Sequence, residues 1–198
     1  QQANLDAWWK MNETGGTTVN DGSGQGASVH DGLLQGTFGT ASWIGGKFDN
    51  ALTLDGTNDY VLVSGYAGIT GSDRRTVALW FNSSEENQPI LSYGIPGTGS
   101  LFKISLNTGA VAVDFGETSV TGGSDLADGN WHHLTVTTPA GGLVSATKLY
   151  VDGTPVASGN GAININTSPA SFVKLGSDGS NYFNGMLDEV RFYSIDLN

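Results

Sequence analysis

The chain has 198 residues and a formal net charge of −11, and only 14% of its residues are charged. An acidic chain with eight Lys and Arg residues lacks the basic patch that nucleic acids and anionic lipids require. It has no cysteine, which excludes disulfides, thiolate nucleophiles and zinc–thiolate sites. No apolar run reaches the about 18 residues of a membrane-spanning helix. We therefore expect no nucleic-acid partner and no membrane insertion.

The apolar residues fall into short runs separated by turn residues, without the stripe of an amphipathic helix. In chain order, these runs predict strands at residues 5–11, 47–54, 60–63, 76–82, 89–93, 102–106, 110–115, 131–137, 148–151, 155–157, 172–175 and 186–193. Asn107-Thr108-Gly109 and Asp152-Gly153 predict tight hairpin turns, and the 30 glycines supply the positive φ angles that turns need. The pattern predicts one all-β domain over residues 1–198, a two-sheet antiparallel β-sandwich of the jelly-roll type.

Eight short motifs follow one another over almost the whole chain. They are residues 8–11 (WWKM), 20–26 (NDGSGQG), 46–52 (GKFDNAL), 54–61 (LDGTNDYV), 76–81 (TVALWF), 128–134 (DGNWHHL), 149–153 (LYVDG) and 183–193 (FNGMLDEVRFY). In this order, the motifs resemble the bacterial laminin-G-like modules of the concanavalin A-like lectin/glucanase superfamily. The resemblance implies a jelly roll and a module excised from a larger secreted or cell-surface protein. It does not imply one activity, because this fold hosts lectins, adhesive modules, glycosidases and lyases.

Asp188 lies in the last predicted strand, where strand alternation places it on one face with Met186, Val190 and Phe192. We expect that face to be buried. An isolated ionised carboxylate is costly to desolvate, so Asp188 needs a partner. The partner is either a cation or a set of backbone N–H groups.

The acidic loop at residues 21–31 is the predicted cation site. Calcium prefers six to eight oxygen ligands, from carboxylates and from backbone carbonyls on a flexible loop. The resemblance implies a structural calcium between this loop and the C-terminal end of the chain. It would be held by the side chains of Asp21 and Asp188 and by backbone oxygens of Gln25 and His30. The alternative is that Asp21 only caps a turn.

The sequence lacks the patterns of a catalytic site. Glycosidases of the superfamily that the chain resembles carry acidic residues at alternating positions of one strand, and no such run occurs here. Glu85 and Glu86 are adjacent, so they would point to opposite sides of a strand. His132 and His133 lie in a motif that resembles a structural motif of the family. We predict that the chain is not an enzyme; a glycosidase or a lyase is the alternative.

Aromatic side chains in turn-rich segments are the predicted sugar platforms, because sugars present apolar faces and many hydroxyls. They are Tyr66, Tyr93 and Tyr182, the last with its neighbour Asn181. Arg74 and Arg75 form the only adjacent basic pair. Such a pair could clamp a carboxylate or sulfate of an acidic polysaccharide. The alternative is that one of these arginines pairs with a nearby carboxylate such as Asp73.

These observations predict a non-catalytic carbohydrate-binding module. It would hold a secreted polysaccharide-degrading enzyme or a surface protein near its polysaccharide or oligosaccharide by raising the effective concentration. Its partners would be that glycan and a neighbouring catalytic or surface domain of the same precursor. The competing hypothesis is a protein–protein adhesive or structural module without a glycan site.

Overall fold

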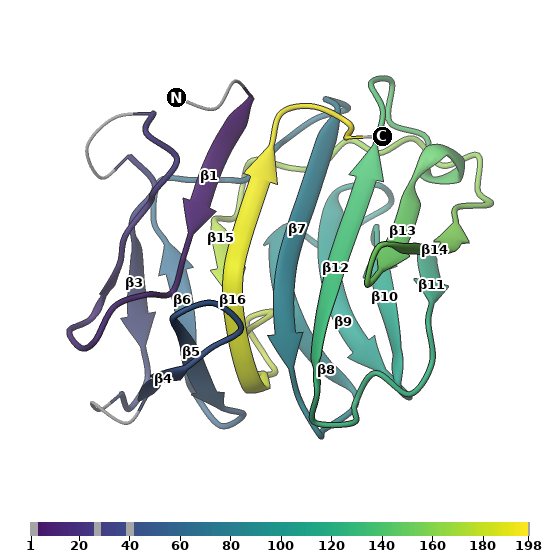
Figure 1. The fold of residues 1–198 in the computed structure, drawn as a ribbon. Coiled ribbons are helices and arrows are strands. Elements are labelled where there is room, and N and C mark those ends of the chain that lie inside the picture. Colours follow the sequence, from purple (N-terminus) through teal and green to yellow (C-terminus); the bar gives the residue numbers. More distant parts are fainter. Residues whose placement is uncertain (1–3, 26–28, 39–41, 198) are drawn as a thin grey trace.

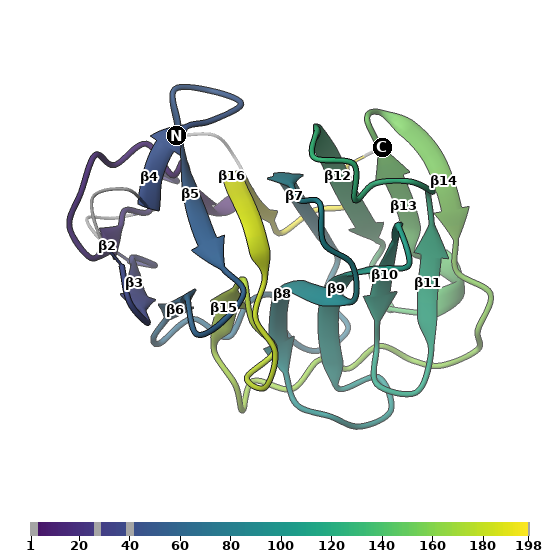
Figure 2. The ribbon, with the colours of Figure 1, turned by 90° about the horizontal axis from the view of Figure 1, so that it is seen from below.

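The structure is a computed structural model, and it describes residues 4–25, 29–38 and 42–197. Within these residues, two eight-stranded antiparallel sheets pack face to face. Figure 1 looks onto the first sheet, with the second behind it, and Figure 2 shows the two layers from below. The predicted two-sheet sandwich is thereby confirmed.

The first sheet has the strand order β14-β13-β12-β7-β16-β5-β4, and β1 also pairs with β16. Its strands are β1 (Leu5–Trp9), β4 (Trp43–Gly45), β5 (Asn50–Asp55), β7 (Arg75–Asn82), β12 (Trp131–Thr138), β13 (Lys148–Val151), β14 (Thr154–Ser158) and β16 (Asn184–Tyr193). The turn Asp152-Gly153 joins β13 to β14 with both residues at positive φ, as the sequence predicts.

The second sheet has the strand order β11-β10-β9-β8-β15-β6-β3-β2. Its strands are β2 (Thr18–Val19), β3 (Gly32–Gln35), β6 (Tyr60–Val63), β8 (Gln88–Gly94), β9 (Leu101–Asn107), β10 (Ala110–Asp114), β11 (Ser119–Gly122) and β15 (Val173–Leu175). The 3₁₀ turn η2 (Val144–Ala146) precedes β13. The sequence did not predict β2, β3, β4 or β11, which are short.

The core lies between the two sheets. Strand alternation sends every second side chain inward, so that Leu79 and Phe81 of β7 belong to the same buried cluster as Phe102 and Ile104 of β9. None of the helices in the described part of the chain is long and apolar enough to cross a membrane.

Strand β16 is the centre of the first sheet, and a bulge divides it. Residues 184–187 pair with β5 and residues 190–193 pair with β1, while the register against β7 shifts between Asp188 and Arg191. Glu189 is the extra residue and has a φ of 55°. The bulge breaks the alternation, because it turns Asp188 onto the outer face beside Trp80. The predicted grouping of Asp188 with Val190 and Phe192 is therefore wrong, although Asp188 is buried.

Candidate functional site

The outer face of the second sheet carries an open groove over strands β8 to β11. The groove has a volume of about 430 Å³. Amide, hydroxyl, carboxylate and ammonium groups dominate its lining, among them Asn87, Lys103, Ser105, Asp114, Thr121 and Asn181. We call this depression the polar groove.

Strand alternation produces this polar face. Along β9, Phe102 and Ile104 point into the core, whereas Lys103 is only half-buried and lines the groove with Ser105. On β10 and β11 the valines also point inward, whereas Ala112 and Asp114 of β10 and Ser119 and Thr121 of β11 line the groove. A sheet with one face in the core and one in solvent is what this alternation predicts.

Lys103 is the charged centre of the polar groove. Its Nζ lies 3.7 Å from Asp114 Oδ2 and 3.7 Å from Asp178 Oδ2. Lys103 and Asp114 are cross-strand partners in the β9–β10 hairpin, while Asp178 comes from the loop before β16. The lysine therefore ties the sheet to that loop, and its charge is already balanced by two carboxylates.

Asp178 orders the loop at residues 178–182, which borders the groove. Its Oδ1 accepts hydrogen bonds from the backbone N–H groups of Ser180 (3.0 Å) and Asn181 (2.9 Å). Burial raises the pKa of Asp178, but these hydrogen bonds and the nearby Lys103 ammonium outweigh it, and the pKa lies below its ordinary value. Ser177 Oγ also donates to the Asn181 carbonyl. Asn181 is thus presented to the solvent from an anchored loop.

Two further depressions adjoin the polar groove. One, of about 430 Å³, shares Asn87 and Asn181 with it and is also lined by Tyr182. The other, of about 250 Å³, shares Lys103 and Asn181. The ring of Tyr182 lies 6.0 Å from that of Tyr60, measured between centroids. Because Asn181 lines all three depressions, they form one extended polar surface, which we call the extended groove.

Two of the predicted carbohydrate-binding residues, Asn181 and Tyr182, therefore lie in the extended groove. The other two predicted tyrosines do not. Tyr66 is 6% exposed and Tyr93 is 1% exposed; Tyr66 donates a short hydrogen bond to Asp6, and Tyr93 stacks on Phe102. The predicted platform role of Tyr66 and Tyr93 is wrong, because a ring in the core offers no face to a sugar.

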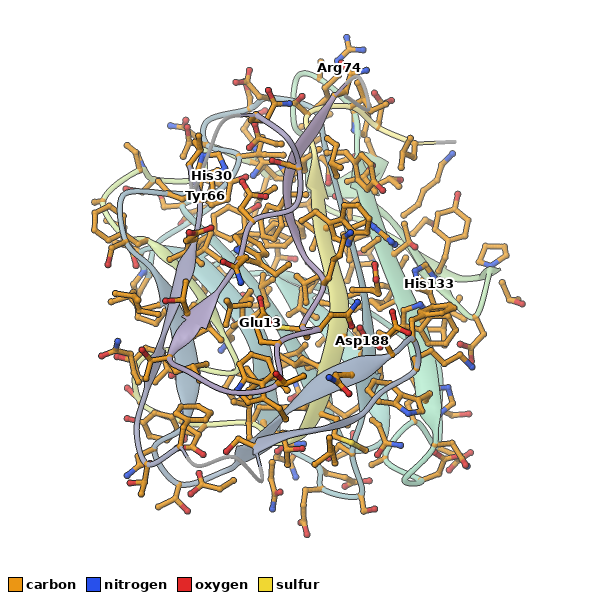
Figure 3. The ribbon with its side chains drawn as sticks, turned by 60° about the vertical axis from the view of Figure 1, so that its left-hand side comes forward. Glu13, His30, Tyr66, Arg74, His133 and Asp188 are labelled. Carbon is orange, nitrogen blue, oxygen red and sulfur yellow. The ribbon has the colours of Figure 1, made fainter. Side chains whose placement is uncertain are left out.

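The predicted arginine clamp is also wrong. Arg75 is 0% exposed and donates to the Asp73 carbonyl (3.1 Å), the Gly71 carbonyl (2.7 Å) and Thr167 Oγ1 (2.8 Å). These hydrogen bonds hold the guanidinium inside the protein, where a ligand carboxylate or sulfate cannot reach it. Arg74 is exposed, with its Nη1 3.7 Å from Asp196 Oδ1. It lies just before β7, at the top of Figure 3, and does not line the extended groove.

The structure gathers part of the predicted calcium ligand set beside β1. Asp21 Oδ1 accepts from the backbone N–H groups of Trp8 (3.0 Å) and Ser23 (2.9 Å), and Asp21 Oδ2 lies 3.6 Å from His30 Nδ1. The His30 carbonyl accepts from Trp9 Nε1. Gln25 is nearby, since its side chain donates to the carbonyl of Leu5.

Asp188 does not join these residues. Figure 3 shows it well separated from His30, beside the turn between β4 and β5. Asp188 Oδ2 accepts from the Phe48 N–H at 2.9 Å, and burial raises the pKa of Asp188 to about 6. Among the described residues, no cluster of three or more His, Asp or Glu side chains is arranged to hold a metal ion. The four predicted ligands do not form one site in this structure.

The outer face of the first sheet carries Trp8 and Trp80, and cationic side chains lie over both rings. Lys10 Nζ lies 4.2 Å and the Arg191 guanidinium 4.7 Å from the ring centroid of Trp8. Lys47 Nζ lies 4.5 Å from the ring of Trp80, and the His133 ring 5.0 Å from it. We call these side chains the cation–tryptophan face.

His132 has a structural environment. Its Nδ1 lies 2.8 Å from Asp152 Oδ2 and its Nε2 3.2 Å from Asp128 Oδ1. Both ring nitrogens are therefore engaged in joining two turns at one end of β12. These two contacts give His132 a structural role in the link between the two turns.

The sequence analysis did not predict Lys103, Asp114 or Asp178 as binding residues. The sequence does contain a signal for the pairing of Lys103 with Asp114. The predicted turn at Thr108 and Gly109 fixes the hairpin register, which places Lys103 opposite Asp114. No comparable local signal brings Asp178 to Lys103, because the two residues belong to different parts of the chain.

Comparison with known proteins now identifies the class. The family model described as the concanavalin A-like lectin/glucanases superfamily, a laminin G model, matches residues 55–198. The fold has the same two-sheet jelly-roll architecture. The chain belongs to this superfamily. No sequence among curated proteins matches the chain.

Solved structures with a similar fold come from several proteins. Domain 4 of AbnA, an extracellular arabinanase of Geobacillus stearothermophilus, in complex with arabinotriose, has 19% identity and a TM-score of 0.69, with 100% of this chain and 96% of that chain covered. The binding domain of Paraclostridial Mosquitocidal Protein 1 has 17% identity, a TM-score of 0.70 and coverages of 98% and 50%. Trypanosoma rangeli sialidase has 17% identity, a TM-score of 0.65 and coverages of 100% and 32%. The chain thus spans half of the mosquitocidal protein's binding domain and about a third of the sialidase.

Proposed function

We propose that the chain is a non-catalytic carbohydrate-binding module and that its glycan lies in the extended groove. The observation that carries the proposal is the open depression of about 430 Å³ lined by side-chain amides, hydroxyls and carboxylates. Sugar hydroxyls both donate and accept hydrogen bonds, so a site of mixed donors and acceptors suits them. Domain 4 of AbnA, which has this fold over nearly its full length, was solved with arabinotriose, and this supports the choice of ligand class.

The roles of the groove residues follow from their groups. Asn181 donates and accepts through its amide, and Ser105 and Thr121 offer hydroxyls. Tyr182 supplies a half-buried ring at one end of the extended groove. An open groove suits a segment of a longer glycan chain more than a single sugar.

The biological role that we propose is targeting. The module would keep a secreted polysaccharide-degrading enzyme or a surface protein close to its glycan, which raises the effective concentration of the attached domain without any chemistry. The similar structures support this role, because the sialidase and the mosquitocidal protein's binding domain carry this fold as one part of a longer chain.

A structural calcium at the loop around Asp21 stays a prediction. Its support is that Asp21 and His30 lie together beside β1, and a carbonyl that accepts one hydrogen bond retains a second lone pair. If calcium binds there, the melting temperature rises in calcium chloride relative to EDTA, and the rise is lost in Asp21→Asn. An equal melting temperature in both buffers contradicts the prediction.

The proposed function is tested by an array of plant and animal glycans, followed by calorimetry on the best ligand. We expect Asn181→Ala with Tyr182→Ala to weaken binding about tenfold or more. The matched control is Asn160→Ala with Tyr150→Ala, which removes the same two residue types outside the extended groove. Release of reducing sugar from the bound glycan would show an enzyme instead, and no binding to any glycan would contradict the proposal.

A further inference from the structure

The extended groove has an unbalanced charge. Its lining contains two ammonium groups and six carboxylates, which leaves a formal net charge of −4. The lysines are Lys103 and Lys174, and the carboxylates are Asp55, Glu85, Glu86, Asp114, Glu117 and Asp178. Glu85, Glu86 and Glu117 are exposed, so a ligand in the groove meets their charges directly.

The cation at the centre of the groove is not available to an anionic ligand. Lys103 lies between Asp114 and Asp178, 3.7 Å from each. A ligand carboxylate at Lys103 would have to displace one of these partners or bind beside both of them. Lys174 lies only in the smallest of the three depressions.

No arginine lines the described surface of the extended groove. Arginine is the residue that binds a carboxylate or sulfate with two parallel hydrogen bonds. In this chain Arg75 is in the interior, Arg191 pairs with Glu189 on the first sheet, and Arg74 lies near Asp196. The groups that an acidic sugar needs are therefore present in the protein but are placed elsewhere.

We propose that the extended groove selects uncharged glycans and rejects glycans that carry carboxylate or sulfate groups. This inference rests on the proposed function, since it names the ligand class of the same groove. The physical reason is repulsion: each acidic sugar brings a negative charge into a depression that already has a net charge of −4. Such repulsion between exposed charges is strongest at low ionic strength and fades as the Debye length shortens to about 3 Å at 1 M salt.

The test uses matched glycans that differ only in charge. Homogalacturonan oligosaccharides and their fully methyl-esterified forms share one backbone, and neutral arabino-, xylo-, gluco- and manno-oligosaccharides extend the uncharged set. We expect every ligand found to be uncharged. In any matched pair that binds, the uncharged form should bind about tenfold more tightly at low salt, with a smaller difference in 1 M NaCl. Equal or tighter binding of the acidic form overturns the inference and leaves the proposed function standing.

A charge variant tests whether charge repulsion, and not the shape of the groove, causes the preference for neutral glycans. Glu86→Gln with Glu117→Gln removes two exposed charges from the groove at nearly constant side-chain volume. We expect this variant to narrow the difference in affinity between neutral and acidic ligands about threefold. The control is Asp49→Asn with Asp73→Asn, which removes two exposed charges outside the groove and should leave this difference in affinity unchanged. An unchanged difference in the groove variant overturns the inference. Absence of binding to all glycans overturns the proposed function, and this inference with it.

Discussion

The two sheets present opposite kinds of outer surface. The second sheet carries the extended groove, which is polar and open, with Lys103 and its two carboxylates at the centre. The first sheet carries the cation–tryptophan face, where Lys10 and Arg191 lie over Trp8. Aromatic rings are the usual sign of a sugar site, yet here the rings of Trp8 and Trp80 lie under the chain's own cations. The comparison teaches that the accessibility of a ring matters more than its presence on a surface.

The covering has an energetic meaning. A cation over a tryptophan ring contributes about 0.5–1 kcal/mol at exposed sites and more when it is desolvated. A sugar that stacked on Trp8 or Trp80 would have to displace such a contact first. The outer face of the second sheet imposes no comparable penalty, because its depressions are open.

The largest expected effect is a difference in unfolding free energy between substitutions of Tyr93, in the core, and Tyr182, in the extended groove. Tyr93→Ala should lower the free energy of unfolding by about 3–5 kcal/mol, because it opens a cavity beside Phe102 and Phe192. Tyr182→Ala, at the half-buried surface, should lower it by about 1 kcal/mol or less. Urea unfolding of both variants measures the difference, and equal losses would contradict the burial of Tyr93.

The second prediction concerns the centre of the extended groove. Lys103→Ala leaves Asp114 and Asp178 without the cation that joins them. We expect glycan affinity to fall about tenfold, which is about 1.4 kcal/mol, because the loop at residues 178–182 loses its tie to the sheet. Calorimetry measures this, and Lys148→Ala on the first sheet is the control. Unaltered affinity in Lys103→Ala would place the glycan elsewhere.

The third prediction tests the cation–tryptophan face directly. Trp8→Ala removes the contacts with both cations and the hydrogen bond from Nε1 to Glu189 at 2.7 Å. We expect a stability loss of about 1 kcal/mol and a change in glycan affinity of less than about twofold. A large loss of glycan affinity with an unchanged melting temperature would place the glycan on the cation–tryptophan face and not in the extended groove.

The smallest expected effect is a dependence on pH. Burial and the neighbouring Arg191 lower the pKa of His133, so protonation favours the unfolded chain. His133 therefore destabilises the fold as the pH falls from 7 through the ordinary value of about 6.5 towards the lowered pKa. His133→Gln should lose less stability than the parent between pH 7 and pH 5 in urea unfolding. A larger loss in the variant would contradict this sign.

The sequence predicts the sandwich because short alternating runs and turn residues act locally. The hairpins at Thr108-Gly109 and Asp152-Gly153 form as expected, since positive φ at both turn residues sets the strand register. The turn at Thr108-Gly109 also sets the strand register that places Lys103 opposite Asp114. These features need only a few neighbouring residues.

The site was harder to predict because it depends on contacts between distant segments. Tyr93 and Tyr182 both lie near glycines and polar residues, but only Tyr93 meets Phe102 and Phe192 in the core. The Glu189 bulge reverses the direction of Asp188, and simple alternation cannot include an extra residue. Phe192, which helps to bury Tyr93, lies far from it in the sequence, whereas the bulge arises within β16 itself.

The position of β16 has a consequence for how the chain folds. Trp8 and Glu189, which are hydrogen-bonded across the first sheet, are separated by 181 residues, and β16 supplies the edges to which β1, β5 and β7 attach. During synthesis on the ribosome, β1 and the edge of β5 that does not pair with β4 therefore lack their β16 partner until β16 emerges. Closing so long a loop is entropically costly, and folds dominated by such non-local pairing form slowly. The nascent chain is thus most exposed to aggregation before its last described strand is made.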